Sequence, residues 1–213
     1  MLKLYSYFRS SCAYRVRIAL EHKGLVWDTI PIHLLKGQQR SEEYLKNNPS
    51  AMVPALLLEN ESVLTQSLAI LEYLEEAHPE KALLPQNFQD RAIVRAMAQI
   101  ISVDVQPLQN LRVTRYLKEE INASEAQVNL WLKNFITEGM SAFEVFLQRH
   151  AGIYCFGDQI SMADVCLAPQ ILSTLRFGVD LAQWSKISEV SQRLERIPAF
   201  IQAHPKNQPD FSV

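Results

Sequence analysis

The residues most able to do chemistry stand together near the start of the chain, as Ser10, Ser11 and Cys12. An apolar pattern of helical spacing follows them directly, so the two hydroxyls and the thiol fall at a predicted helix start. A serine in this position caps the free N–H groups of the first turn. The same helix end carries about half a positive charge, which lowers the pKa of a thiol. Capping alone is one interpretation; the other is a site that holds a thiolate, supplied by Cys12 or by a bound thiol cofactor.

Two further stretches have both a structural and a functional interpretation. Val53-Pro54 precedes a predicted strand, and an ordinary strand-entry proline explains it unless the bond is cis. In the cis case, the backbone of Val53 is expected to pair with a peptide-like ligand. Gln66 and Ser67 stand at a second predicted helix start. Capping is again the simpler role, and binding of a carboxylate is the alternative.

Hydrophobic periodicity places these stretches in a small α/β arrangement. The predicted order is a strand at 2–7, a helix at 13–23, a strand at 26–34, a short helix at 41–47, strands at 53–59 and 62–65, and a helix at 67–78. Gly24 and Pro79 mark helix ends, and Pro31 places its strand at a sheet edge or at the end of the strand. In this βαβ-α-ββα order, all the candidate stretches are expected at one edge of the sheet.

The character of the chain changes after the last predicted strand and helix. From residue 90 the pattern is helical with little strand signal, and helices are expected to start at Ser124, Ser161 and Pro198. We therefore expect an N-terminal α/β domain over 1–82, a linker over 83–89 and an all-helical domain over 90–213. Asp164 is expected to cap the helix that begins after Ser161, rather than to act in catalysis.

Composition limits the classes of protein that need to be considered. The 213 residues carry a formal net charge of -2 and no basic run, which argues against nucleic acid as a partner. The three cysteines show no paired spacing, so neither a disulfide framework nor a metal site is expected, and Cys155 and Cys166 are expected to be buried. The first residues form a strand pattern rather than a signal peptide, and apolar runs are far shorter than the roughly 18 residues of a membrane span. A cytoplasmic location follows as the expectation.

Several segments spread over the chain match the pattern of a known family. They include LYSYFRSSCAYRVRIALEHKG, VPAL, QSLAILEYLEE, QPLQNLRV, AGIYCFGDQISMADVCLAPQ and RFGVDL. In these segments the sequence resembles the zeta class of glutathione transferases. The SSC run with RVRIAL distinguishes this class from relatives that use tyrosine or a lone serine, although Ala13-Tyr14 departs from the serine and tryptophan common there. The resemblance implies a thioredoxin-like N-terminal domain, an all-α helical-bundle C-terminal domain and glutathione as cofactor.

The resemblance also implies roles for individual residues. Ser10 would donate a hydrogen bond to the glutathione sulfur, with Ser11 and Cys12 completing the anion-stabilising turn. Val53, beside a cis Pro54, would pair with the cysteinyl part of glutathione. The remaining contacts would come from a set of polar side chains: Gln39 at the glycyl end, Gln66 and Ser67 at the γ-glutamyl end, and Gln106 and Asn110 from the helical domain.

The implied reaction is glutathione-dependent cis-trans isomerisation of maleylacetoacetate to fumarylacetoacetate, in tyrosine and phenylalanine catabolism. Thiolate addition to the double bond allows rotation, and elimination restores the thiol. The candidate clamps for this small dicarboxylate are Arg9, Arg112 and Arg176, each of which could instead be a solvated or structural arginine. The alternatives are maleylpyruvate isomerisation, general glutathione conjugation or α-haloacid dehalogenation, and a non-catalytic interaction module. The family resemblance also implies a homodimer.

Overall fold

The structure is a computed structural model that describes residues 1–212, and it divides into two compact units. The first consists of Met1–Ala82 together with the segment from Arg196 onward, and the second is Leu83–Glu195. The sequence pattern predicts a single helical domain over residues 90–213. The segment from Arg196 instead packs on the N-terminal unit, because the apolar residues Ala199, Phe200 and Ala203 bury their side chains there.

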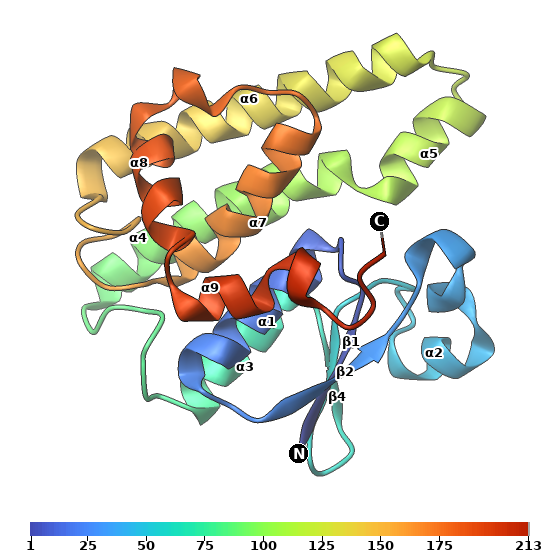
Figure 1. Cartoon of the computed structure of the whole chain (residues 1–213), viewed down its shortest axis with the longest axis horizontal. Coiled ribbons are helices and arrows are strands. Elements are labelled where there is room, and N and C mark those ends of the chain that lie inside the picture. Colours follow the sequence, from blue (N-terminus) through green and yellow to red (C-terminus); the bar gives the residue numbers. More distant parts are fainter. Residues whose placement is uncertain (213) are drawn as a thin grey trace. The chain divides into compact units, whose positions relative to one another are not determined.

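The first unit contains a four-stranded sheet with the order β2-β1-β3-β4 (Figure 1). β1 pairs with β2 in parallel and with β3 in antiparallel fashion, and β3 and β4 form an antiparallel pair. The predicted βαβ-α-ββα order is confirmed, and β2 is an edge strand that ends at Pro31, as that proline predicts. The elements are β1 (Leu2–Ser6), α1 (Ser11–Lys23), β2 (Trp27–Pro31), the 3₁₀ helices η1 (Leu34–Lys36) and η2 (Gln38–Arg40), α2 (Glu42–Asn47), β3 (Ala55–Leu57), β4 (Val63–Thr65), α3 (Ser67–Ala77), α9 (Pro198–Ala203) and the 3₁₀ helix η6 (Pro205–Asn207).

Helix α1 has a clear start and a clear end in the sequence. Ser10 is its N-cap, and Gly24 takes the left-handed conformation, with φ of 71°, that ends the helix. Two arginines on this helix, Arg15 and Arg17, are completely buried. The Nε of Arg17 donates to the carbonyl of Ala203 over 3.0 Å, which ties α1 to the neighbouring α9 (Figure 1).

The second unit is helical, as predicted. It contains α4 (Phe88–Gln99), the π-helical turn η3 (Ile100–Val105), the 3₁₀ helix η4 (Gln106–Gln109), α5 (Leu111–Glu119), α6 (Glu125–His150), α7 (Met162–Arg176), the 3₁₀ helix η5 (Leu181–Gln183) and α8 (Ser185–Leu194). Ser124 and Ser161 cap α6 and α7, and Asp164 completes the capping box of α7 as expected. Asp164 also accepts the N–H of Cys155, and burial raises the pKa of this carboxyl.

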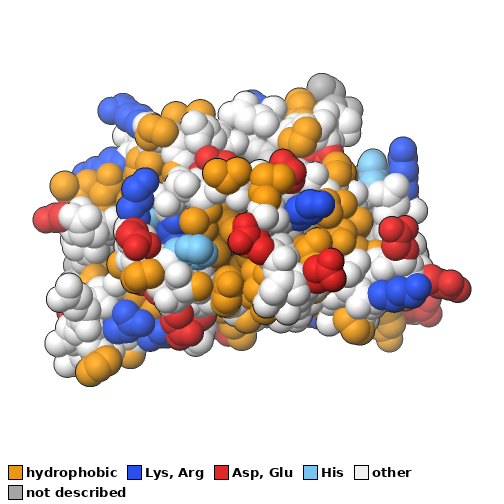
Figure 2. Space-filling model, turned by 90° about the horizontal axis from the view of Figure 1, so that it is seen from below, with side chains coloured by type: hydrophobic (Ala, Val, Ile, Leu, Met, Phe, Trp, Pro, Cys, Tyr) orange, Lys and Arg blue, Asp and Glu red, His pale blue; other side chains and the backbone are white. Residues whose placement is uncertain are grey.

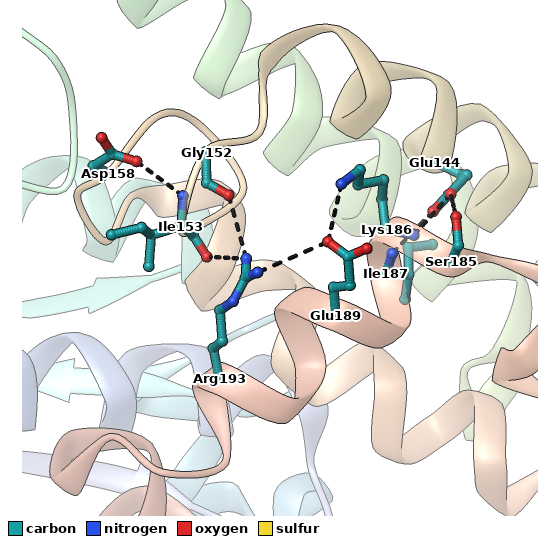
Figure 3. Close-up of polar contacts among 9 residues, drawn as sticks. All are labelled: Glu144, Gly152, Ile153, Asp158, Ser185, Lys186, Ile187, Glu189 and Arg193. Carbon is teal, nitrogen blue, oxygen red and sulfur yellow. Dashed lines mark hydrogen bonds and ion pairs between the residues drawn. The ribbon is translucent and has the colours of Figure 1, made fainter.

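Charged side chains connect α6 and α8 of the second unit (Figure 3). Glu144 of α6 accepts the backbone N–H groups of Lys186 and Ile187, both at 2.9 Å, and so caps the start of α8. At the other end of α8, Arg193 donates to the carbonyl of Ile153 over 2.8 Å. The Glu144 contact gives the free N–H groups at the start of α8 an acceptor, and the Arg193 contact ties the last turn of α8 to the loop at Ile153.

One face of the molecule carries side chains of both signs of charge side by side (Figure 2). On the face drawn in Figure 2, acidic and basic side chains alternate among hydrophobic ones, in keeping with the formal net charge of -2. Over residues 1–212, no helix has the length and apolar character that crossing a membrane requires.

Candidate active site

The start of α1 forms the centre of the candidate site. Ser10 has extended backbone angles, and its Oγ accepts the N–H of Ala13 over 3.2 Å. A hydroxyl has one donor hydrogen and two acceptor lone pairs, so this cap uses only acceptor capacity. The O–H of Ser10 can therefore donate to a ligand while the oxygen caps the helix, and the two interpretations of this serine are compatible. Ser11 and Cys12 follow in the first turn and are partly exposed.

Arg15 lies directly beneath this turn, and its role could not be foreseen from the sequence. Its side chain is 1% exposed, and its NH1 atom lies 3.4 Å from Ser67 Oγ and 3.8 Å from Cys12 Sγ. The first turns of α1 and α3 are therefore neighbours, as the topology predicted. The Nε and NH2 atoms of Arg15 have no hydrogen-bond partner among the described residues. The site thus holds a buried guanidinium that pairs with no carboxylate among residues 1–212.

The start of α3 supplies a second set of donors. Ser67 is 7% exposed, and Gln66 before it is exposed and takes a left-handed φ of 68°. The side chain of Gln66 makes no capping hydrogen bond, so its amide is available to a ligand. Strained backbone at a residue other than glycine is concentrated at ligand sites, and free N–H groups at a helix start bind carboxylates. The start of α3 is therefore suited to bind an anionic group.

The Val53–Pro54 bond is cis, as the resemblance implies. Two donors hold the carbonyl of Met52, the residue before Val53. Tyr44 Oη donates to this oxygen over 2.6 Å, and Asn48 Nδ2 donates to it over 2.7 Å. Burial raises the pKa of Tyr44 to about 12, so its phenol remains a donor at neutral pH. Tyr44 also packs in an apolar cluster whose members are Tyr7, Phe8, Ile32, Tyr44 and Val53. The cluster therefore joins the Val53 segment to the residues that precede Ser10.

The remaining candidates of the first unit lie at its surface. Gln39 in η2 is partly exposed, and its Oε1 is buried without a hydrogen-bond partner. Such an orphaned acceptor is suited to a donor group of a ligand. Arg9 is exposed and directly precedes Ser10, so its guanidinium is free to reach a ligand bound at the start of α1.

The second unit carries the other four candidates. Gln106 begins η4, and Asn110 caps α5 by accepting the N–H of Arg112 over 3.0 Å. Arg176 is the last residue of α7 and lies over the ring of Phe177, 4.5 Å from its centre. Within this unit a buried pair of amides ties the two segments together, because Gln109 of η4 donates to Gln170 of α7.

Comparison with known proteins identifies the class to which this fold and site belong. Residues 1–76 match the family described as glutathione S-transferase, N-terminal domain, and residues 109–206 match glutathione S-transferase, C-terminal domain. The chain therefore belongs to the glutathione S-transferase family.

Individual relatives identify the class within this family. The chain is 49% identical over 209 residues to the maleylacetoacetate isomerase of Rattus norvegicus, covering 97% of this chain and 94% of that protein. A bacterial maleyl pyruvate isomerase, described as a zeta-class glutathione transferase, superposes with a TM-score of 0.95 at 39% identity, covering 99% of this chain and all (100%) of the other. The maleylacetoacetate isomerase of Methylobacterium extorquens AM1, solved with bound malonate and glutathione, has a TM-score of 0.95 at 36% identity, with coverage of 99% and 100%. The resemblance to the zeta class is confirmed.

Proposed function

We propose that this protein is a glutathione-dependent isomerase that converts maleylacetoacetate into fumarylacetoacetate. The observation that carries the proposal is the start of α1, where the capping oxygen of Ser10 leaves its O–H free to donate, beside a buried cation at Arg15. In a non-catalytic scaffold this arrangement would only lower stability, because the buried guanidinium of Arg15 has no carboxylate partner in the described part of the chain.

The residues of the first unit fit a tripeptide that has a thiol in the middle and a carboxylate at each end. The start of α3, with Gln66 and Ser67, would bind the γ-glutamyl carboxylate. The backbone of Val53 beside Pro54 would pair with the central peptide groups, and Gln39 would reach the glycyl end. Gln106 and Asn110 are the proposed contributions of the helical unit. In the Methylobacterium extorquens relative, glutathione is bound together with a dicarboxylate.

Bound glutathione would supply a thiolate that adds reversibly to the cis double bond and so permits rotation about it. Ser10 would hold the sulfur in its charged form by donating a hydrogen bond to it, since donors to a charged group stabilise that form. Ser11 and Cys12 would complete the positive end of the helix around the same atom. Arg9, Arg112 and Arg176 would bind the two carboxylates of the substrate, because guanidinium groups stay charged and match the planar fork of a carboxylate.

A second candidate substrate is maleylpyruvate, which is also a small cis-unsaturated diacid. It is favoured by one observation, the TM-score of 0.95 and 39% identity to the maleyl pyruvate isomerase. The same arginines suit either diacid. We further propose that the protein acts as a homodimer in the cytoplasm, within tyrosine and phenylalanine catabolism.

The test compares both diacids as substrates of the purified protein, with and without glutathione. We expect loss of the cis isomer only when glutathione is present, and faster turnover of maleylacetoacetate. Activity without the thiol would contradict the mechanism, and faster turnover of maleylpyruvate would select the second candidate.

Ser10→Ala, compared with a control variant, separates the effect of the hydroxyl on the glutathione sulfur from its effect as a helix cap. We expect the variant to lower kcat by about 100-fold or more while the Kd of glutathione changes only a few-fold, because without this donor the bound sulfur remains a thiol, which still binds but is a far weaker nucleophile than the thiolate. The matched control is Ser124→Ala, which removes a cap of the same kind from α6. Both variants should lose about 1 kcal/mol of stability, and only Ser10→Ala should lose turnover. Equal losses in kcat and in glutathione affinity would show that the hydroxyl only helps to hold the cofactor.

A further inference from the structure

The segment that leads into α1 is held by residues from the far end of the chain. Asp210 Oδ2 accepts the backbone N–H of Phe8 over 2.9 Å, across a separation of 202 residues. Phe8 is 4% exposed and stands two positions before Ser10. The turn that follows it is closed by the N–H of Ser10, which donates to the carbonyl of Tyr7 over 2.9 Å. Any shift of the backbone at Phe8 is therefore passed to Arg9 and Ser10.

A buried arginine holds the other backbone group of Phe8, its carbonyl. Arg17 is 0% exposed, and its NH2 donates to the carbonyl of Phe8 over 3.2 Å, while its NH1 donates to Ser6 Oγ over 2.9 Å. Burial lowers the pKa of Arg17 to about 10, and the nearby charges of Tyr14 and Asp210 oppose that shift. The backbone N–H of Phe8 is thus bound by the acidic Asp210, and its backbone carbonyl by the basic Arg17.

Asp210 is itself fixed by the turn in which it lies. The buried Gln208 donates its Nε2 to the carbonyls of Gln202, over 2.9 Å, and His204, over 3.1 Å. The N–H of Phe211 closes the turn on the carbonyl of Gln208 over 3.0 Å. The ring of Phe211 meets the ring of Phe8 edge-on, with centres 5.5 Å apart and planes at 87°. The carboxylate therefore reaches Phe8 from a rigid support.

The hydrogen bonding of Asp210 is incomplete for a residue that serves stability alone. Its Oδ1 is buried and has no hydrogen-bond partner among the described residues. A buried carboxylate oxygen without a donor carries a desolvation cost that one good hydrogen bond only partly offsets. The one hydrogen bond that Asp210 does make, to the N–H of Phe8, acts directly on the backbone that leads into Ser10.

We propose that Asp210 is a positioning residue for the candidate active site, which fixes the backbone of Phe8 and thereby sets the placement of Arg9 and Ser10. The inference rests on the proposed function, because it assigns Ser10 to the thiolate and Arg9 to the substrate. It adds the segment from Arg196 onward to the parts of the chain that determine turnover.

The test compares Asp210→Ala with Asp210→Asn, in which an amide oxygen can still accept the N–H of Phe8. Asp28→Ala serves as the matched control, because Asp28 is an exposed acidic residue of β2 in the same unit. For Asp210→Ala we expect kcat to fall by about 10- to 100-fold, since a misplacement of about 1 Å has an effect of that size, while the Kd of glutathione stays within about threefold. Asp210→Asn should recover at least half of the lost activity on a logarithmic scale, and Asp28→Ala should behave as the unaltered protein.

A second measurement is independent of the substrate. Hydrogen exchange of the Phe8 amide, followed by NMR, should accelerate at least tenfold in Asp210→Ala and remain slow in Asp210→Asn. If the unaltered protein isomerises neither diacid, the proposed function fails, yet this exchange result still shows whether Asp210 fixes Phe8. Unchanged exchange in Asp210→Ala would overturn the inference. So would unchanged kcat, or an Asp210→Asn variant as impaired as Asp210→Ala in both measurements.

Discussion

Replacing Arg15 should move stability and glutathione binding in opposite directions. The guanidinium is 1% exposed and donates two long hydrogen bonds, to Ser67 Oγ at 3.4 Å and to Cys12 Sγ at 3.8 Å. Its Nε and NH2 have no partner among the described residues. In the free protein these few contacts offset little of the desolvation of the charge, which amounts to several kcal/mol for a buried ion.

The size of both effects can be estimated from these contacts. Arg15→Met keeps an unbranched apolar side chain in the space and removes the charge, so the free energy of unfolding should stay the same or rise by about 1–3 kcal/mol. Glutathione should bind less tightly, because the cation stands behind Ser67, where a carboxylate is proposed to bind. A charge-assisted contribution of about 1.5–3 kcal/mol corresponds to a Kd that is about 10- to 100-fold weaker.

Urea unfolding and calorimetric titration with glutathione measure the two quantities on the same samples. Arg15→Lys is the matched variant, since it keeps the positive charge and should retain most of the affinity. A loss of more than about 2 kcal/mol of stability in Arg15→Met, with the Kd of glutathione unchanged, would refute the reasoning. In that case the arginine would stabilise the fold and make no contribution to glutathione binding.

Two further predictions concern stability. The phenol of Tyr44 has a pKa of about 12 in the folded chain against 10.0 when unperturbed, so the unfolded chain loses its proton first and stability falls as pH rises from 10 toward 12. Urea unfolding at pH 8 and pH 11 should therefore show about 1 kcal/mol more loss for the unaltered protein than for Tyr44→Phe, and parallel losses would contradict the assignment. Glu144→Ala should destabilise the protein by about 2 kcal/mol, because it leaves the N–H groups of Lys186 and Ile187 at the start of α8 without their acceptor. Glu144→Gln should lose less stability, and the exposed control Glu138→Ala should lose almost none. Equal shifts of the unfolding midpoint in Glu144→Ala and Glu138→Ala would argue against a capping role of Glu144.

Local sequence signals were sufficient to predict most of the helices and strands of the first unit. Ser10 and Gly24 bound α1 because capping and left-handed backbone depend on single residue types. Pro31 ended β2 for a similarly local reason, the missing N–H of proline. The predicted strand at 26–34 was longer than β2, since Ile32 and His33 form a connection and Leu34 already begins the 3₁₀ helix η1.

Contacts between distant parts of the chain could not be predicted in the same way. Periodicity treats an arginine as polar, so it assigned no core position to Arg15 or Arg17. Their burial depends on groups far along the chain, such as Ser67 and the carbonyl of Ala203. The left-handed φ of Gln66 also had no signal, because glycine and asparagine are the residues that usually mark that conformation. The candidate site was thus located by its helix starts, and the charges beneath it emerged only from the fold.

The first unit is built from two segments that are far apart in the chain, and this determines the order in which the protein can fold during synthesis. A ribosome makes Met1–Ala82 first, then the whole of Leu83–Glu195, and only afterwards the segment that covers α1. Until that segment emerges, Arg17 lacks the carbonyl of Ala203, and the hydroxyl of Tyr14 lacks the carbonyl of Phe200. The contacts of Arg17 and Tyr14 with α9 therefore form only at the end of synthesis, and completion of the N-terminal unit is a late event.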